Sequence, residues 1–335
     1  MNTHRRATFV LILILCYFKI SLSIEPISTG IVIGVGTLMG YNHETIYENT
    51  ICRIAECCND RSIPKNFTQL KEDFNKHLFG QHIVQEQVLK ALENHYHYIE
   101  TSKKPLVMSF HGTPGTGKNF VADFIVKAIY KNGLDSKYVH RFSGKLDFAS
   151  EALTDIYSNE LKKVIFSAIK MCPMSMFIFD EVDAMPIGVF DTITSLLDHH
   201  EKVNGLDFRK AVFIFLGNTG GVGIADTVYK HYKNHQHSRE ELKLHHFETI
   251  LELSAYNEGG LKKSRPIESG LIDHFIPFLP LEKQHIIACI EVEFKRLGIE
   301  MTEQRKNDLL DYVTFEGLFA KNGCKRISKK AEIYA

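Results

Sequence analysis

The chain has 335 residues, of which 44% are hydrophobic and 24% charged, and its 40 basic and 40 acidic side chains cancel. This length allows a sizeable core and two domains, and the composition is that of a globular protein. The balanced charge gives no indication of nucleic-acid binding. The 17 histidines are scattered and lack the acidic or cysteine companions of a zinc site.

Residues 1–23 have the order of a secretory signal peptide. Arg5 and Arg6 precede an almost wholly apolar run over 7–18, and Ser21-Leu22-Ser23 offers small residues at the cleavage spacing. The run is short for a membrane span, although an uncleaved anchor is the alternative. A lumenal address permits disulfides among the six cysteines that remain after cleavage, whose pairing the sequence alone leaves open: Cys52, Cys57, Cys58, Cys172, Cys289 and Cys324.

Residues 24–59 combine an apolar segment with a small cysteine-bearing element. The glycine-rich, uncharged stretch 27–41 is too short to cross a bilayer unaided. We expect it either to lie against a membrane face or to pack as a strand-like segment. Asn66 begins the sequon Asn66-Phe67-Thr68, which is usable for glycosylation only after translocation.

Residues 60–278 alternate between helical and strand patterns, which predicts a parallel sheet with helices on both faces, an α/β fold. The pattern changes in residues 279–335, where helices over 283–297 and 303–312 predict a smaller, mainly α-helical domain. In the larger domain the expected helices are 70–78, 83–99, 120–129, 161–171 and 189–197, and the expected strands are 106–110, 138–142, 176–179 and 211–216.

The loop after the strand over 106–110 has the GxxxxGK spacing of a phosphate-binding loop. It lies between an apolar strand and an amphipathic helix, which is the context that the motif requires. Its glycines let the backbone amides approach phosphate oxygens, and Lys118 reaches the β- and γ-phosphates, so we expect ATP to bind here. The residues of this loop are Gly112, Thr113, Pro114, Gly115, Thr116, Gly117, Lys118 and Asn119.

Asn119 departs from this motif, because Ser or Thr normally follows the lysine and ligates Mg²⁺. Its amide oxygen can still bind the ion or a metal-bound water, which predicts an altered metal shell and a weaker or slower site. The alternative is that Asn119 only caps the following helix.

Polar residues at the ends of two other strands are candidates for the hydrolysis of ATP. Asp180 and Glu181 end the strand over 176–179, at the edge where open α/β sheets bind ligands. We expect Asp180 to hold Mg²⁺ through water and Glu181 to polarise the attacking water. Asn218 ends the next strand and can orient that water, and Lys325 follows the C-terminal helices, where it could contact the γ-phosphate.

Together these motifs resemble the torsin family of AAA+ ATPases, which is related to Clp/HSP100 proteins. The resemblance covers roughly residue 51 to the C-terminus, and the Cys52, Cys57 and Cys58 group also resembles that of torsins. The matching segments are 78–82, 117–119, 177–183, 213–218, 275–281 and Gly323-Cys324-Lys325. Of these, 78–82 resembles the family's entry to the nucleotide pocket.

The resemblance implies a location in the lumen of the endoplasmic reticulum and the perinuclear space, with the membrane contacted through residues 27–41. It also implies a sensor role for Lys325 and a disulfide between Cys324 and Cys289. Such a disulfide would link redox state to nucleotide contacts, because its geometry would fix the loop of the lysine.

Torsins lack the arginine finger of other AAA+ proteins, and residues 269–274 of this chain contain no arginine. The nearest one, Arg265, precedes a proline and is a poor substitute. Because an arginine finger contributes about 10³ to 10⁵ in turnover, the resemblance implies slow hydrolysis alone and a membrane-anchored lumenal activator that supplies the arginine. We also expect self-association or a hetero-oligomer.

The sequence therefore predicts an activator-dependent ATPase that remodels proteins or membrane-linked complexes. A module in which ATP gates binding or assembly, with incidental turnover, is the main alternative, favoured by Asn119 and opposed by Glu181. A P-loop kinase fits less well, because the Asp-Glu pair and the sensor Asn suit water as the acceptor.

Overall fold

The computed structural model describes residue 52 and residues 55–235 and 238–334. The predicted signal peptide and the apolar segment 27–41 lie outside these residues. The chain divides into two compact units, Met1–Cys57 and Cys58–Ala335, and Cys52 forms a disulfide with Cys57 within the first. Within the described residues, no helix has the length and apolar character needed to span a bilayer.

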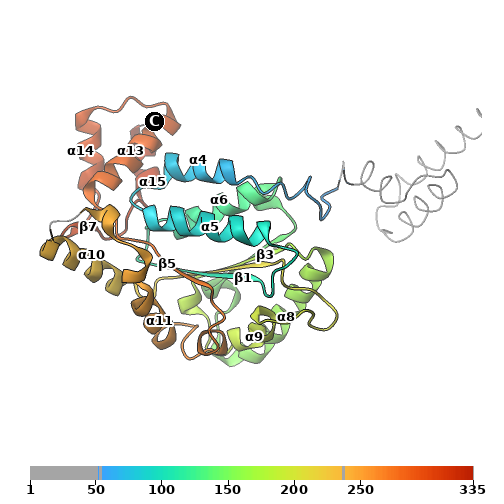
Figure 1. Cartoon of the computed structure of the whole chain (residues 1–335). Helices are drawn as coiled ribbons and strands as arrows, with labels where there is room; N and C mark the ends of the chain where they lie inside the picture. Colours follow the sequence, from blue (N-terminus) through green and yellow to red (C-terminus); the bar gives the residue numbers. More distant parts are fainter. Residues whose placement is uncertain (1–51, 53–54, 236–237, 335) are drawn as a thin grey trace, which may run out of the picture. The chain divides into compact units, whose positions relative to one another are not determined.

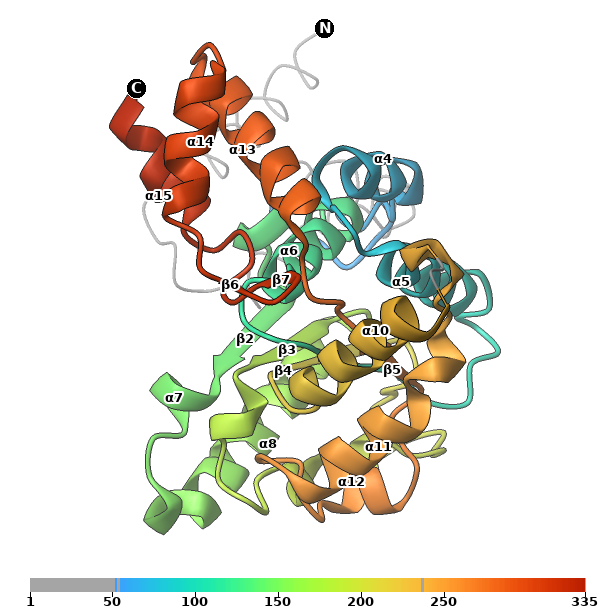
Figure 2. The same ribbon diagram turned by 90° about the vertical axis from the view of Figure 1, so that its left-hand side faces the viewer.

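The second unit is built on a five-stranded, wholly parallel sheet with the order β2-β3-β4-β1-β5 (Figures 1 and 2). The α/β prediction is therefore confirmed. The strands are β1 (Leu106–His111), β2 (Val139–Ser143), β3 (Met176–Asp180), β4 (Val212–Gly217) and β5 (His274–Pro277). Four of them match predicted strands, whereas β5 was not predicted: it has only four residues and ends in a proline, which a sheet edge tolerates.

The central strands are buried on both faces, which explains their continuous apolar sequences. Side chains alternate between the faces. Ile178 and Ile214 pack beneath α4 (Phe67–His77), α5 (His82–His97) and α6 (Lys118–Ile129), which Figure 1 shows above the sheet. On the opposite face Phe177 stacks on Phe213, with ring centroids 4.8 Å apart.

The opposite face is covered mainly by α8 (Thr154–Met171), α9 (Thr194–Leu197) and the segment before α9. The helix predicted over 189–197 is wrong in part, because Phe190–Ile193 is a 3₁₀ turn and only Thr194–Leu197 is α-helical. Phe190 packs edge-on against Phe179 and Phe215, and this packing overrides local helix propensity. The remaining helices of this part were not predicted: α7 (Gly144–Asp147), α10 (Gly221–His235), α11 (Glu248–Asn257) and α12 (Arg265–Glu268).

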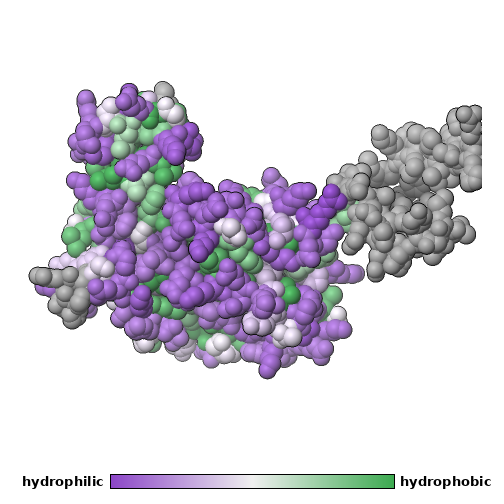
Figure 3. Space-filling view, turned by 45° about the horizontal axis from the view of Figure 1, so that its top comes forward, coloured by the Kyte–Doolittle hydropathy of each residue, from purple (hydrophilic) through white to green (hydrophobic). Residues whose placement is uncertain are grey.

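The C-terminal region is mainly helical, as predicted, and has its own apolar cluster. It comprises α13 (Lys283–Leu297), α14 (Glu303–Asp311), α15 (Ile327–Ala331) and a two-residue antiparallel pair, β6 (Phe315–Glu316) and β7 (Phe319–Ala320). In the view of Figure 3 the described surface is mostly hydrophilic, and apolar groups are visible on this region at the upper left. Tyr312, Leu318 and Ile333 are among its exposed residues.

A second disulfide joins Cys58, near the start of this unit, to Cys172, which follows α8 directly. The two cysteines are 114 residues apart in sequence. This bond links the segment before α4 to the segment that leads into β3. It therefore restrains the chain close to the strand that carries Asp180 into the candidate site.

Candidate nucleotide-binding site

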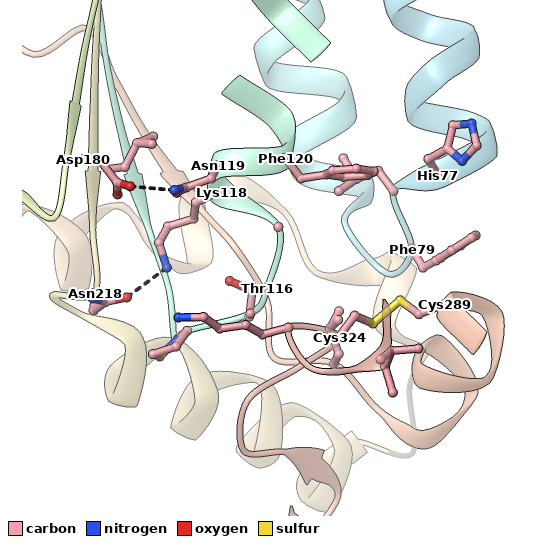
Figure 4. Close-up of a pocket in the computed structure, with 18 of the residues that line it drawn as sticks. His77, Phe79, Thr116, Lys118, Asn119, Phe120, Asp180, Asn218, Cys289 and Cys324 are labelled. Atoms are coloured by element: carbon pink, nitrogen blue, oxygen red, sulfur yellow. Dashed lines mark hydrogen bonds between the residues drawn. A yellow bond between two sulfur atoms is a disulfide. The ribbon is translucent and has the colours of Figure 1, made fainter. Parts of the chain in front are cut away.

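A cavity of about 500 Å³ lies at the carboxyl ends of β1, β3 and β4 (Figure 4). Its remaining walls come from the segment between α4 and α5 and from the C-terminal helices. Most of the predicted site residues line it: Pro114, Gly115, Thr116, Gly117, Lys118, Asn119, Asp180, Glu181, Asn218, Cys289, Cys324 and Lys325. Gly112 and Thr113 contribute backbone carbonyls that contact Lys118.

Lys118 begins α6, and its side chain is buried beneath the loop. Its Nζ donates to the carbonyl oxygens of Gly112 and Thr113 at 2.6 and 3.1 Å and to Oδ1 of Asn218 at 3.1 Å. Burial lowers the pKa of Lys118 to about 8, although the nearby carboxylates of Asp183 and Asp180 oppose this shift. The lysine is thus a partly desolvated cation suited to an anionic ligand.

Asn119 and Asp180 are in direct contact, because Nδ2 of Asn119 donates to Oδ2 of Asp180 at 2.6 Å (Figure 4). Helix α6 has no side-chain cap, so the alternative that Asn119 caps it is wrong. The contact leaves the amide oxygen of Asn119 beside a carboxylate, and oxygen ligands of this kind suit Mg²⁺.

Glu181 is held by residues of the β2–α7 segment that the sequence did not single out. Ser143 Oγ donates to one carboxylate oxygen at 3.2 Å, and Lys145 forms an ion pair with the other. Lys145 also lines the cavity. Because Ser143 lies 38 residues before Glu181, only the pairing of β2 with β3 brings the two together.

Asp183 fixes the orientation of Asn218. Its carboxylate accepts from the backbone N–H of Asn218 at 2.9 Å and from the side-chain Nδ2 at 3.2 Å. The amide oxygen of Asn218 is therefore the atom that faces Lys118. A carbonyl oxygen accepts hydrogen bonds, so Asn218 can orient a water molecule, which donates, but cannot donate to a phosphate in this orientation.

The end of the cavity away from Asp180 is aromatic. His77 and Phe79, which flank the turn after α4, lie on the same side as Phe120 of α6, as Figure 4 shows. Flat rings of this kind can pack against a purine base. The sequence indicated only 78–82 as the pocket entry and missed His77 and Phe120.

The C-terminal region touches the phosphate-binding loop directly. The N–H of Cys324 donates to the carbonyl of Gly115 at 3.2 Å, and Cys324 forms a disulfide with Cys289 of α13. A Cβ on Gly115 would lie 1.8 Å from the carbonyl oxygen of Asn322, so this approach requires glycine at position 115. Lys325 follows at the cavity wall, and its charge contributes to lowering the pKa of Lys118.

The residues present fit a nucleotide with Mg²⁺. Among the described residues, no group of three or more His, Cys, Asp or Glu side chains could hold a metal on its own. Asp180 and Asn119 supply two side-chain oxygens, and Mg²⁺ in nucleotide sites takes its other ligands from water and phosphate.

The chain is similar to torsins over almost its whole length. A family model described as Torsin matches residues 52–179. A "Torsin-like protein" of Drosophila melanogaster is 44% identical over 317 residues, covering 92% of each chain. A "Torsin-like protein" of Caenorhabditis elegans is 34% identical over 341 residues, covering 97% of this chain and 94% of the relative.

Solved structures with a similar fold include Hsp104 of S. cerevisiae in complex with ADP. The TM-score is 0.56 and the identity 16%, and the match covers 85% of this chain and 49% of that one. A closed-state reconstruction of Hsp104 with ATPγS and FITC casein gives a TM-score of 0.54 and 16% identity, covering 90% of this chain and 50% of that one. The chain thus spans about half the length of these AAA+ neighbours.

Nucleotide affinity should fall as the pH rises above about 8. Below its pKa Lys118 is protonated and attracts phosphate, and above this value the free site loses the charge. The dissociation constant of a fluorescent ATP analogue, measured from pH 6.5 to 9.5, should therefore rise by up to about tenfold per pH unit in the upper range. Lys118→Arg is the control: weaker binding without this pH dependence is expected, since arginine keeps its charge.

Asp183→Asn should lower ATP turnover about ten- to a hundredfold, because the amide of Asn218 could then rotate out of its productive orientation. Affinity should change by less than about threefold at pH 6.5, where Lys118 stays protonated. Release of radiolabelled phosphate measures the rate. Asp226→Asn, at an exposed position of α10, should have no effect, and unchanged turnover in Asp183→Asn would contradict the positioning of Asn218.

Proposed function

Because the chain belongs to the torsin family, we propose that it is an AAA+ ATP hydrolase of the endoplasmic reticulum lumen and perinuclear space that remodels proteins or membrane-linked complexes. The observation that supports hydrolysis best is the convergence of Lys118, Glu181 and Asn218 on one cavity at the carboxyl edge of the sheet. A site for binding alone needs the lysine but neither the carboxylate nor the sensor amide.

Each residue has a role that follows from its contacts. Lys118 and the loop amides bind the β- and γ-phosphates. Asn218 orients the attacking water through its amide oxygen, and Glu181 accepts the proton of that water. Asp180 and Asn119 would hold Mg²⁺, which when bound neutralises charge on the phosphate oxygens. Lys325, on the loop beside Gly115, would contact the γ-phosphate.

We further propose that turnover requires a membrane-anchored lumenal activator that brings an arginine. None of the cavity-lining residues in the described part of the chain is an arginine. Arg265, the nearest to the expected finger position, begins α12 and is exposed, with its backbone N–H bonded to Asp191. The ion pair between Glu181 and Lys145 also favours slow turnover in the isolated chain, because it occupies the proposed base.

The second candidate function is an ATP-gated module in which nucleotide drives assembly and hydrolysis is incidental. The same ion pair favours it, since a carboxylate held by a lysine is a poorer base. The two candidates differ in whether Glu181 determines the rate.

Glu181→Gln should bind ATP with near wild-type affinity and lose turnover by about 10²- to 10⁴-fold, because the amide cannot accept the proton of the water. The measurement is phosphate release by wild type and variant, alone and with lumenal domains of proteins captured on the ATP-bound variant. A captured domain that stimulates only the wild type supports the enzyme. Equal rates for both proteins, with no stimulation by any domain, would favour the binding module.

The lumenal location predicts a glycan on Asn66, which is exposed and directly precedes α4. Its Oδ1 caps the helix by accepting from the N–H of Gln69 at 3.0 Å, which leaves Nδ2 available for the glycan. Thr68→Ala and Asn66→Gln should both abolish the glycosidase-sensitive mobility shift. Only Asn66→Gln should also lower the free energy of unfolding, by about 1 kcal/mol through loss of the cap. If the wild-type chain expressed in secretory cells showed no glycosidase-sensitive mobility shift, the result would contradict the lumenal location.

A further inference from the structure

Among the residues that the structure describes, Arg239 is the most deeply buried charged side chain outside the cavity, with 3% of its surface exposed. It lies in a short 3₁₀ turn after α10, in a polar stretch to which the sequence assigned no role. Its guanidinium makes hydrogen bonds with two separate segments of the chain, and each segment continues into a wall of the nucleotide cavity.

The first partner of Arg239 is the segment between α4 and α5. Nε and Nη2 both donate to the carbonyl oxygen of Gly80, at 2.9 and 2.7 Å. Gly80 directly follows Phe79, which lines the aromatic end of the cavity. The next residue, Gln81, donates to the carbonyls of Thr116 in the phosphate-binding loop and of Leu279, at 3.0 and 2.8 Å. The pocket entry is therefore held at two successive residues.

The second partner is the beginning of α13. Nη1 of Arg239 donates to Oε1 of Glu282 at 2.8 Å, and the hydroxyl of Tyr232 on α10 donates to the same oxygen at 2.7 Å. Helix α13 supplies Cys289 and Glu293 to the lining of the cavity. One guanidinium thus connects the entry segment with the first turn of a helix that also lines the nucleotide site.

The two segments also touch each other at this point. Gly80 has φ +65°, and a Cβ there would lie 2.7 Å from Nε2 of His285, so the imidazole packs directly on the glycine. Burial, followed by the charge of Arg239, lowers the pKa of His285 to about 4, so this ring is neutral at physiological pH. No hydrogen bond joins the ring to Gly80, so this contact is weakly directional, whereas the guanidinium sets the spacing through three hydrogen bonds.

We infer that Arg239 is a positioning residue for the nucleotide cavity: it holds the pocket entry at Gly80 against α13 at Glu282 and so fixes the relative position of two segments that line the site. This inference rests on the proposed binding of ATP. A buried ion pair adds little net stability, because desolvation offsets most of the attraction, but it defines a geometry. Removing one partner would leave the other charge buried and unpaired, so a test of the geometry has to keep the charge.

Arg239→Lys tests this inference, because lysine keeps the buried charge but cannot reproduce the guanidinium fork that bonds Gly80 and Glu282 together. In the full chain, the dissociation constants of fluorescent ATP and ADP analogues should rise roughly fivefold or more. Each protein is measured at the same interval below its own melting temperature, so that a change in stability does not affect the comparison. The turnover number at saturating ATP should stay within about twofold of wild type, which a general loss of structure would not allow.

The matched control is Arg209→Lys. Arg209 forms a two-point ion pair with Asp207 and does not line the cavity, so its variant should bind nucleotide as wild type does. Glu282→Gln keeps Oε1 as an acceptor and should weaken binding less than Arg239→Lys, and the double variant should be no weaker than Arg239→Lys alone.

Wild-type affinity in Arg239→Lys, or equal weakening in Arg209→Lys, would overturn the inference. Failure of the wild-type chain to bind either nucleotide would instead reject the proposed function on which it rests. The two failures are therefore distinguishable in one set of titrations.

Discussion

The parallel pairing of β3 with β4 and of β4 with β1 is the constraint on which the site depends. In this register Gly217 lies opposite His111, so that the next residues, Asn218 and Gly112, emerge side by side at one edge of the sheet. A shift of one residue would turn every side chain of a strand to the other face. The phenylalanine rings that pack against each other beneath the sheet oppose such a shift, so apolar packing on one face fixes the geometry of the polar groups at the edge.

The sequence predicted the central strands, the phosphate-binding loop and most of the residues that meet in the cavity. It could do so because each is encoded locally: a continuous apolar run predicts a strand buried on both faces, and a polar residue at its end predicts a ligand edge. Asp180 and Asn218 were each predicted from the end of their own strand, without information on the contacts between the strands. The local sequence also shows that Asn119 replaces the usual Ser or Thr of the motif, but it does not show the contact of Asn119 with Asp180.

The features that the sequence did not predict depend on long-range contacts. Lys145 is an ordinary surface lysine until β2 pairs with β3 and brings it to Glu181. Arg239 lies in a short polar turn, and its partners are 159 and 43 residues away. Asp183 could have been found, since an acid two residues after the Asp-Glu pair can fold back to the next strand end, but no local pattern indicates which atom it would contact.

The polar groups of the site already have partners from the same chain, and this bears on the rate that the isolated protein can reach. Asp183 and Lys118 hold Asn218, Asn119 holds Asp180, and Lys145 holds Glu181. In the first two arrangements Oδ1 of Asn218 and Oδ2 of Asp180 each accept one hydrogen bond and keep a second lone pair for the proposed reaction. The third is different, because Glu181 must exchange Lys145 for water before it can accept a proton. Lys145 is exposed, so the activator that we propose would be able to draw the lysine away as well as supply an arginine. Release of the base and stabilisation of the transition state would then be two effects of a single binding event.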